Sequence, residues 1–211
     1  MDIFWTIVLP TFVTLFIVID PIGMLPVFVS LTQDADAAKK RIVAIRTIVV
    51  SVGVLMFFGL LGTPFLKAIG VGLPAFRIAG GTLLFLIAVE MLFGRRTERR
   101  KRSVEEAQTE FDYDISVFPL AIPMITGPGA VATILLLMNA QVGDVVAQGV
   151  ILSIGIVVLL LCYILFRLSD FIQKIIGETI SKVISRVSGI ILAALATQYV
   201  LDGLRAYWLV A

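Results

Sequence analysis

The chain has 211 residues, of which 59% are hydrophobic and 15% are charged, and its formal net charge is +2. A soluble domain carries about 25% charged residues, so much of this apolar surface must be covered by lipid. The sequence contains no histidine, which excludes a histidine-ligated metal site and a histidine-dependent catalytic centre, and its basic residues lie in loops rather than on one nucleic-acid-binding face.

Six apolar stretches are long enough to cross a bilayer, which needs about 20 residues of helix. Each stretch is apolar on all sides, so none is expected to lie on the membrane surface. No basic segment precedes the first stretch and no cleavage site follows it, which favours a retained helix over a signal peptide. The sequence therefore predicts an all-α membrane protein with six transmembrane helices, at residues 5–31, 42–66, 74–93, 118–139, 145–166 and 183–204.

The basic residues favour one side of the membrane. Of the 17 lysines and arginines, 14 follow the first, third and fifth stretches. By the positive-inside rule these connections face the cytoplasm, so both termini are predicted to lie outside. The longest connection, residues 94–117, is expected to be a solvated cytoplasmic linker that anchors the topology and has no binding role. It separates a first unit, residues 1–93, from a second unit, residues 118–211.

The two units share short motifs in the same order. Residues 19–23 (IDPIG) align with residues 125–129 (ITGPG), and residues 77–80 (RIAG) align with residues 186–189 (RVSG). Three spans per unit is an odd number, so duplicated units would enter the membrane in opposite directions. Such inverted repeats are a recurrent transporter architecture, with the substrate site at the repeat interface. The alternative is two unrelated kinked helices.

The first stretch is predicted to break at Asp20 to Gly23. Pro21 removes a backbone donor, Gly23 permits non-helical backbone, and Pro26 suits the first turn of a new half-helix. Backbone groups freed at membrane depth must face protein or a water-filled cavity.

The fourth stretch is predicted to break at residues 126–129 (TGPG), and Pro119 and Pro123 loosen the run before the break. Free N–H groups that open the second half-helices suit a carboxylate, and freed carbonyls of the first halves suit an ammonium or a cation. A zwitterionic amino acid matches both. Small residues at the breaks allow close approach, and no basic residue lies near either break in the sequence, so a small neutral ligand is expected.

Asp20 is the acidic residue at the first break. An ionised aspartate at the centre of a membrane helix costs about 2.5–3.5 kcal/mol, so a function is expected for it. It could bind the ligand ammonium, bind a cation such as sodium, or take up a proton. Alternatively it caps the restarting half-helix, and both roles could hold together. Thr126 is its neutral counterpart in the second unit and could cap in the same way.

Residues 19–26 (IDPIGMLP) and 122–130 (IPMITGPGA) resemble the two signature segments of the MarC family of inner-membrane proteins, and residues 77–81 (RIAGG) resemble a third. The resemblance implies six spans in two inverted repeats, a location in the cell inner membrane, and a site between the broken helices. The family includes transporters of small neutral amino acids such as glycine and alanine, although its members need not share one substrate.

The sequence thus predicts a carrier that works by alternating access, with Asp20 coupling transport to protons or another cation. The alternatives are a channel or an exporter of another small solute, including a drug or a metabolite. An intramembrane enzyme is disfavoured because no second catalytic group accompanies Asp20, and no cofactor or metal is expected; an oligomer stays open. The predicted substrate-binding residues are Asp20, Pro21, Gly23, Met24, Thr126, Gly127, Pro128, Gly129 and Ala130.

Overall fold

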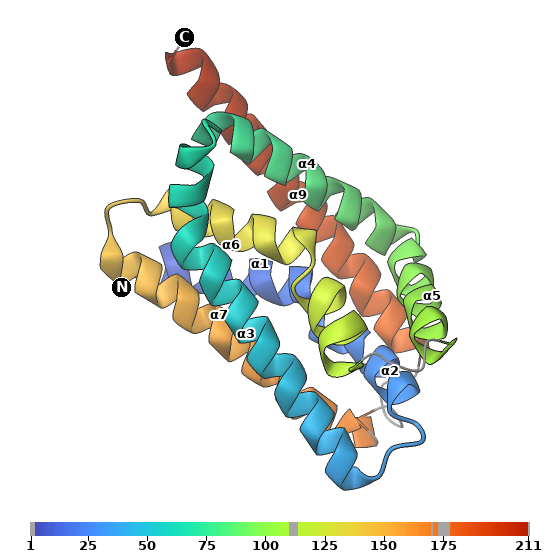
Figure 1. Ribbon diagram of the computed structural model, residues 1–211. Helices are drawn as coiled ribbons and strands as arrows, with labels where there is room; N and C mark the ends of the chain where they lie inside the picture. The colour runs from blue at the N-terminus through green and yellow to red at the C-terminus, as the bar shows by residue number, and fades with distance from the viewer. Residues whose placement is uncertain (1–2, 110–113, 170, 173–177, 211) are drawn as a thin grey trace.

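The computed structural model describes residues 3–109, 114–169, 171–172 and 178–210, and every regular element in these ranges is a helix (Figure 1). This confirms the all-α class. In chain order the elements are η1 (Phe4–Val8), α1 (Leu9–Ile19), α2 (Pro21–Leu31), α3 (Ala37–Ala68), α4 (Leu73–Leu92), α5 (Arg95–Thr109), η2 (Ser116–Ile125), α6 (Pro128–Ala140), α7 (Val145–Arg167) and α9 (Glu178–Val210).

Five segments in the described part of the chain are long and apolar enough to cross a membrane, and η2 with α6, bent by 54°, makes a sixth. They coincide with the six predicted stretches, so the structure agrees with up to six spans. The long helices extend further than predicted. α3, for example, includes the polar residues before Ile42, because the side chain of Asp36 accepts a hydrogen bond from Lys39 N (2.7 Å) and caps an earlier start.

The two interrupted segments form the centre of the molecule. Nearly every residue of α6 is buried, as are Leu15 and Ile19 of α1 and Met24 of α2. The long helices α3, α4, α7 and α9 contact these central segments on one side and expose large apolar side chains on the other, as Leu86 and Leu160 do. That outer surface is suited to lipid, whereas the interrupted helices are enclosed by protein.

Helices α4 and α9 pack against each other along their length, and glycines allow the close approach. A Cβ atom at Gly81 would lie 2.8 Å from the carbonyl oxygen of Ala196, and one at Gly189 would lie 3.0 Å from that of Ala88. Small residues at such contacts let membrane helices gain van der Waals packing. Gly81 of the third motif and Gly189 of its counterpart at residues 186–189 are thus part of this helix pair.

The expectation of a solvated linker is wrong for α5. This segment is a 15-residue helix that packs against α2, α4 and η2. Arg96, Arg100 and Val104 are 7%, 5% and 5% exposed, whereas Arg99 and Arg102 are exposed. The buried residues are four positions apart, so they share one face of the helix, and that face is turned into the protein.

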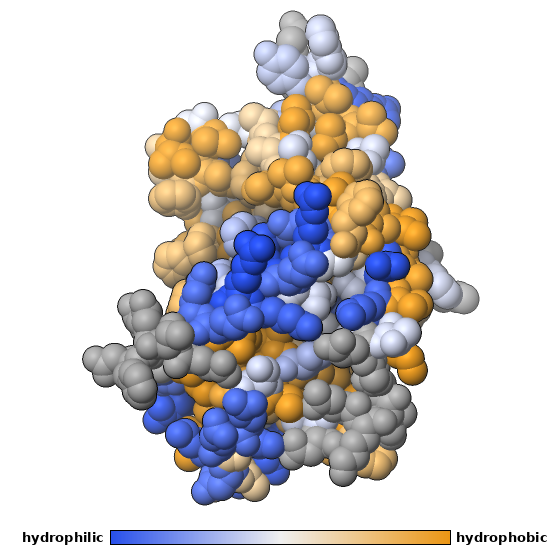
Figure 2. All heavy atoms as spheres, turned by 90° about the vertical axis from the view of Figure 1, so that its right-hand side faces the viewer, coloured by the Kyte–Doolittle hydropathy of each residue, from blue (hydrophilic) through white to orange (hydrophobic). Residues whose placement is uncertain are grey.

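Figure 2 views the molecule from the side on which α5 lies in Figure 1. Hydrophilic side chains gather across the middle of this face, and apolar surface lies above them. The first described helix, η1, and the end of α9 both lie on the side of the molecule away from α5 (Figure 1). Termini on one side are what an even number of spans requires; their location outside the cell stays a prediction.

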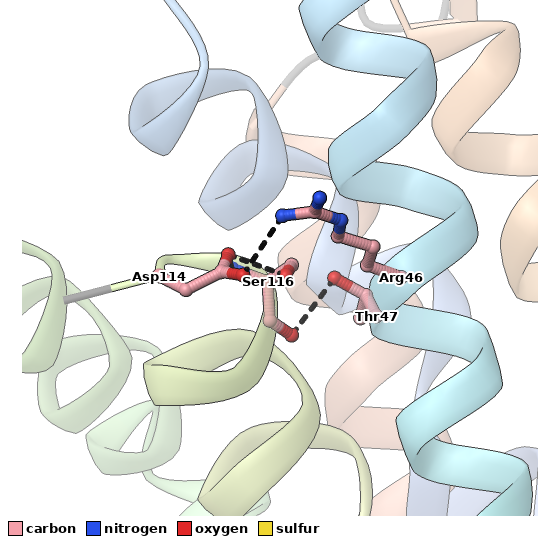
Figure 3. Close-up of polar contacts among 4 residues, drawn as sticks. All are labelled: Arg46, Thr47, Asp114 and Ser116. Carbon is pink, nitrogen blue, oxygen red and sulfur yellow. Dashed lines mark hydrogen bonds and ion pairs between the residues drawn. The ribbon is translucent and has the colours of Figure 1, made fainter.

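Polar contacts fix the start of η2 to α3 (Figure 3). Arg46 Nη1 lies 3.2 Å from Asp114 Oδ2, and the Thr47 hydroxyl donates to the carbonyl oxygen of Ser116 at 3.0 Å. Asp114 Oδ1 in turn accepts from the backbone N–H of Ser116 at 3.0 Å and from its hydroxyl at 2.5 Å. This cluster holds the entry to the second interrupted segment against a long helix.

The cluster predicts an acid-dependent loss of stability. The hydrogen bond from the Ser116 hydroxyl, and further bonds from the Ser116 N–H and Arg46, hold the pKa of Asp114 below its ordinary value of 3.8. The contribution of Asp114 to stability is therefore present above 3.8 and is lost as the pH falls through the lowered pKa. We expect Asp114→Asn and Ser116→Ala to flatten the acid side of a plot of melting temperature against pH. Variants that retained the full acid dependence of the wild type would contradict this origin.

Candidate functional site

The first break lies at a single residue, Asp20. α1 ends at Ile19, Asp20 takes a left-handed conformation (φ 57°, ψ 62°), and α2 begins at Pro21. Asp20 Oδ1 accepts a hydrogen bond from the backbone N–H of Gly23 at 3.1 Å. The predicted break and the cap interpretation of Asp20 are both confirmed.

The second break lies between η2 and α6. η2 is not a regular helix, because Phe118 and Ile122 have extended backbone angles and each precedes a proline through a cis peptide bond. α6 then starts at Pro128 after a bend of 54°. The predicted break at residues 126–129 is confirmed.

Thr126 does not cap α6. Its hydroxyl donates to the carbonyl oxygen of Ala121 at 2.8 Å, because the wide turns of η2 bring that carbonyl next to the side chain. The residue that precedes α6 is Gly127, which has no side chain to accept a hydrogen bond. Among the described residues, the N–H groups of Gly129 and Ala130 therefore receive no side-chain cap, and the positive end of the α6 dipole is left without a carboxylate.

Two buried arginines from α5 reach the first break. Arg100 Nη1 forms an ion pair with Asp20 Oδ2 at 2.8 Å, and both side chains are 6% exposed. Arg96 Nη2 donates to the carbonyl oxygen of Val18 at 2.6 Å. In an unbroken helix that carbonyl would accept from the N–H of residue 22, four positions on. This freed carbonyl, which was expected to suit a ligand ammonium or a cation, is thus already bonded to a guanidinium of the protein itself.

The expectation that no basic residue lies near either break is therefore wrong. Arg100 is 80 positions from Asp20 in the sequence, so proximity along the chain could not reveal the pair. The available signal was the four-residue spacing of Arg96, Arg100 and Val104, which a helix places on one face.

A cavity of about 280 Å³ lies at the second break, between α1, α4, α5 and the start of α6. The second break contributes its backbone and small side chains, α1 contributes Val18, and α5 contributes the two buried arginines. Of the predicted substrate-binding residues, four line this cavity: Gly127, Pro128, Gly129 and Ala130.

The other predicted residues are placed differently. Asp20 contacts Arg100, which lines the cavity. Pro21 and Met24 are buried in α2 outside the lining, and Thr126 is turned towards η2. Gly23 lines a second cavity of about 380 Å³ between α2, α5 and α9. The structure thus brings together the second break and α5. Asp20 and Gly23 lie outside this cavity, and Arg100 links Asp20 to it.

The charges at the cavity wall do not balance. Arg96 and Arg100 are both buried, and Asp20 is the carboxylate that pairs with one of them. Burial, and next the neighbouring Arg100 guanidinium, lower the pKa of Arg96 to about 9. Among the described residues, no three acidic or cysteine side chains gather as a metal site would require. The arrangement suits an anionic group rather than a metal ion.

Comparison with known proteins places the chain among membrane proteins. A family model described as "MarC family integral membrane protein" matches residues 5–208, which include both breaks and α5. A UPF0056 membrane protein of Archaeoglobus fulgidus is 38% identical over 92% of this chain and 90% of its own length. The UPF0056 membrane protein YvbG of Bacillus subtilis is 33% identical over 95% of both chains, and YhcE of Escherichia coli is 31% identical over 92% and 90%. No solved structure is significantly similar to the chain.

Proposed function

We propose that the chain, which belongs to the MarC family of integral membrane proteins, is a carrier. It would move a small polar solute across the membrane. The observation that carries the proposal is the cavity between the two interrupted segments, since broken helices that meet at a cavity form the substrate sites of many carriers. The names of these relatives state no substrate, so the chemistry of the cavity is the guide to the solute.

The size and the polar groups of the cavity favour a small neutral amino acid such as alanine or glycine. Sites for drug-sized ligands measure about 300–1,000 Å³, and this cavity, at about 280 Å³, lies below that range. The two buried arginines and the N-terminus of α6 suit a carboxylate. Asp20 lies outside the lining and is paired with Arg100, so it would meet an ammonium group only once that pair separates. The same small volume argues against drug efflux.

The packing of the helices supports two inverted repeats that move against each other. Helices that correspond in the two units pair with each other, α3 with α7 and α4 with α9. In addition, α1 and α2 pack on α7 in the way that η2 and α6 pack on α3. Alternating access would then move one unit against the other around the cavity. In this scheme Asp20 would take up a proton once its ion pair with Arg100 separates.

Counterflow tests the carrier. Proteoliposomes loaded with unlabelled alanine are expected to take up external labelled alanine faster than empty proteoliposomes, because a loaded carrier returns more readily. A channel, the second candidate, conducts without this acceleration. An imposed pH gradient that drives accumulation in the wild type but not in Asp20→Asn would support proton coupling. Uptake of alanine and glycine no faster than in protein-free vesicles would contradict the proposal.

A further inference from the structure

One guanidinium nitrogen at the cavity has no protein partner. Arg100 uses Nη1 for its ion pair with Asp20, whereas its Nη2 is fully buried and makes no hydrogen bond among the described residues. A buried donor without an acceptor costs about 1–3 kcal/mol, and more when it is charged. Because Arg100 also lines the cavity, a bound group can supply the missing acceptor.

The start of α6 lies on the same cavity and presents donors of the same kind. Gly129 and Ala130 both line the cavity, and their N–H groups belong to the first turn of a 13-residue helix that has no side-chain cap. Pro128, the first residue of that helix, has no N–H. The helix dipole adds partial positive charge at this end.

Nearby carboxylates neutralise this region only in part. Asp20 is occupied by Arg100, and Glu90 pairs through Oε1 with Arg99 at 3.0 Å, on the exposed side of α5. Arg96 bonds to a neutral carbonyl oxygen and to the sulfur of Met91 (3.2 Å). Burial, and next the Arg100 guanidinium, lower the pKa of Arg96 to about 9, and the group is still protonated at neutral pH.

We infer that the cavity contains a carboxylate-binding subsite formed by Arg100, Arg96 and the N–H groups of Gly129 and Ala130. The inference rests on the proposed carrier function and deepens it, because it makes the carboxylate the group by which the solute is recognised. One carboxylate oxygen can accept from the unpartnered Nη2 of Arg100 and the other from the paired N–H donors of the helix N-terminus, while Arg96 adds a nearby positive charge. The free Nη2 donates to the carboxylate while Nη1 keeps its bond to Asp20. The substrate class is therefore small monocarboxylates, in which an ammonium group is an addition and not a requirement.

Three probes of similar size distinguish recognition of the carboxylate from recognition of the ammonium group. Alanine carries a carboxylate and an ammonium, propionate carries the carboxylate alone, and alaninamide carries the ammonium alone. We expect alanine and propionate to raise the melting temperature of the purified protein in detergent, because they bind the folded state, and alaninamide to leave it unchanged. Stabilisation by alaninamide equal to that by alanine would overturn the subsite, and so would equal stabilisation by inorganic phosphate and propionate.

Arg96→Gln tests the residues, because Arg96 lines the cavity and is not the partner of Asp20. We expect propionate to bind at least about tenfold more weakly, since a hydrogen bond to a charged group is lost. Arg102→Gln is the matched control, because it removes the same charge from the exposed face of the same helix and should bind propionate as the wild type does. If Arg96→Gln does not fold, Arg96→Lys, which keeps the charge but loses the planar fork, is expected to show a smaller loss. Unweakened binding in the folded variant would overturn the assignment.

The two proposals fail in different ways. Stabilisation by propionate without alanine counterflow in proteoliposomes would leave the subsite standing and contradict the carrier. Counterflow of alaninamide as fast as that of alanine would leave the carrier standing and contradict the subsite.

Discussion

Replacing Arg100 with alanine is expected to lower the free energy of unfolding by about 3–5 kcal/mol, because it leaves a buried carboxylate without its counter-charge. Arg100 and Asp20 are both 6% exposed and lie 2.8 Å apart. Once the guanidinium is removed, Asp20 keeps the Gly23 N–H as its hydrogen-bond donor among the described residues. A single neutral donor does not compensate for the desolvation of a charged carboxylate.

Equilibrium unfolding of the purified protein in detergent measures this loss. The double variant Asp20→Asn/Arg100→Gln should recover much of the stability, because two neutral side chains of nearly the same shape need no counter-charge. Arg102→Ala, on the exposed face of α5, should change the stability by no more than about 0.5 kcal/mol. If Arg100→Ala were as stable as Arg102→Ala, the ion pair would not exist in the folded protein.

Replacing Gly129 with leucine is expected to abolish alanine counterflow. A Cβ atom at this position would contact Ile87 and would lie 3.4 Å from a methyl group of Val18, so a leucine side chain has no free space except the cavity. It would cover the first-turn N–H groups of α6 and fill the volume that a solute needs. We expect uptake at the level of protein-free vesicles.

Gly149→Leu is the matched control for this experiment. A Cβ atom at Gly149 in α7 would meet nothing within 4 Å, so the same substitution adds a side chain to an exposed position of a membrane helix. Equal amounts of both variants in the vesicles, and equal elution from a sizing column, would show that both fold. Counterflow in Gly129→Leu as fast as in Gly149→Leu would mean that solute does not pass through this cavity.

Both breaks could be predicted from the sequence because their causes are local. Pro21 lacks a donor and fixes its own backbone angle, and the run from Thr126 to Gly129 combines a proline with two glycines, so each segment stops being helical whatever surrounds it. The apolar spans were also predictable, because lipid imposes their length and composition.

The role of α5 could not be predicted in the same way. A run of arginines in a connecting segment has the same composition whether it faces water or protein. Burial of Arg100 depends on Asp20, between α1 and α2, which only the folded chain brings near. The cap predicted for Thr126 failed for a related reason. The repeat aligned it with Asp20, but the Thr126 hydroxyl bonds back to the carbonyl oxygen of Ala121 in η2, and the residue before α6 is Gly127.

The space around Gly23 limits which amino acids this position can accept. A Cβ atom there would overlap the Asp20 carboxylate and would lie 2.8 Å from Arg100 Nη1, so the space is already filled by the ion pair. Even a methyl group, the smallest substituent, must displace one of the two charges. Tolerance of substitution at position 23 therefore falls in one step from glycine to every other amino acid, instead of declining gradually with side-chain size. In a library of all substitutions, alanine would be grouped with tryptophan and not with the parent glycine.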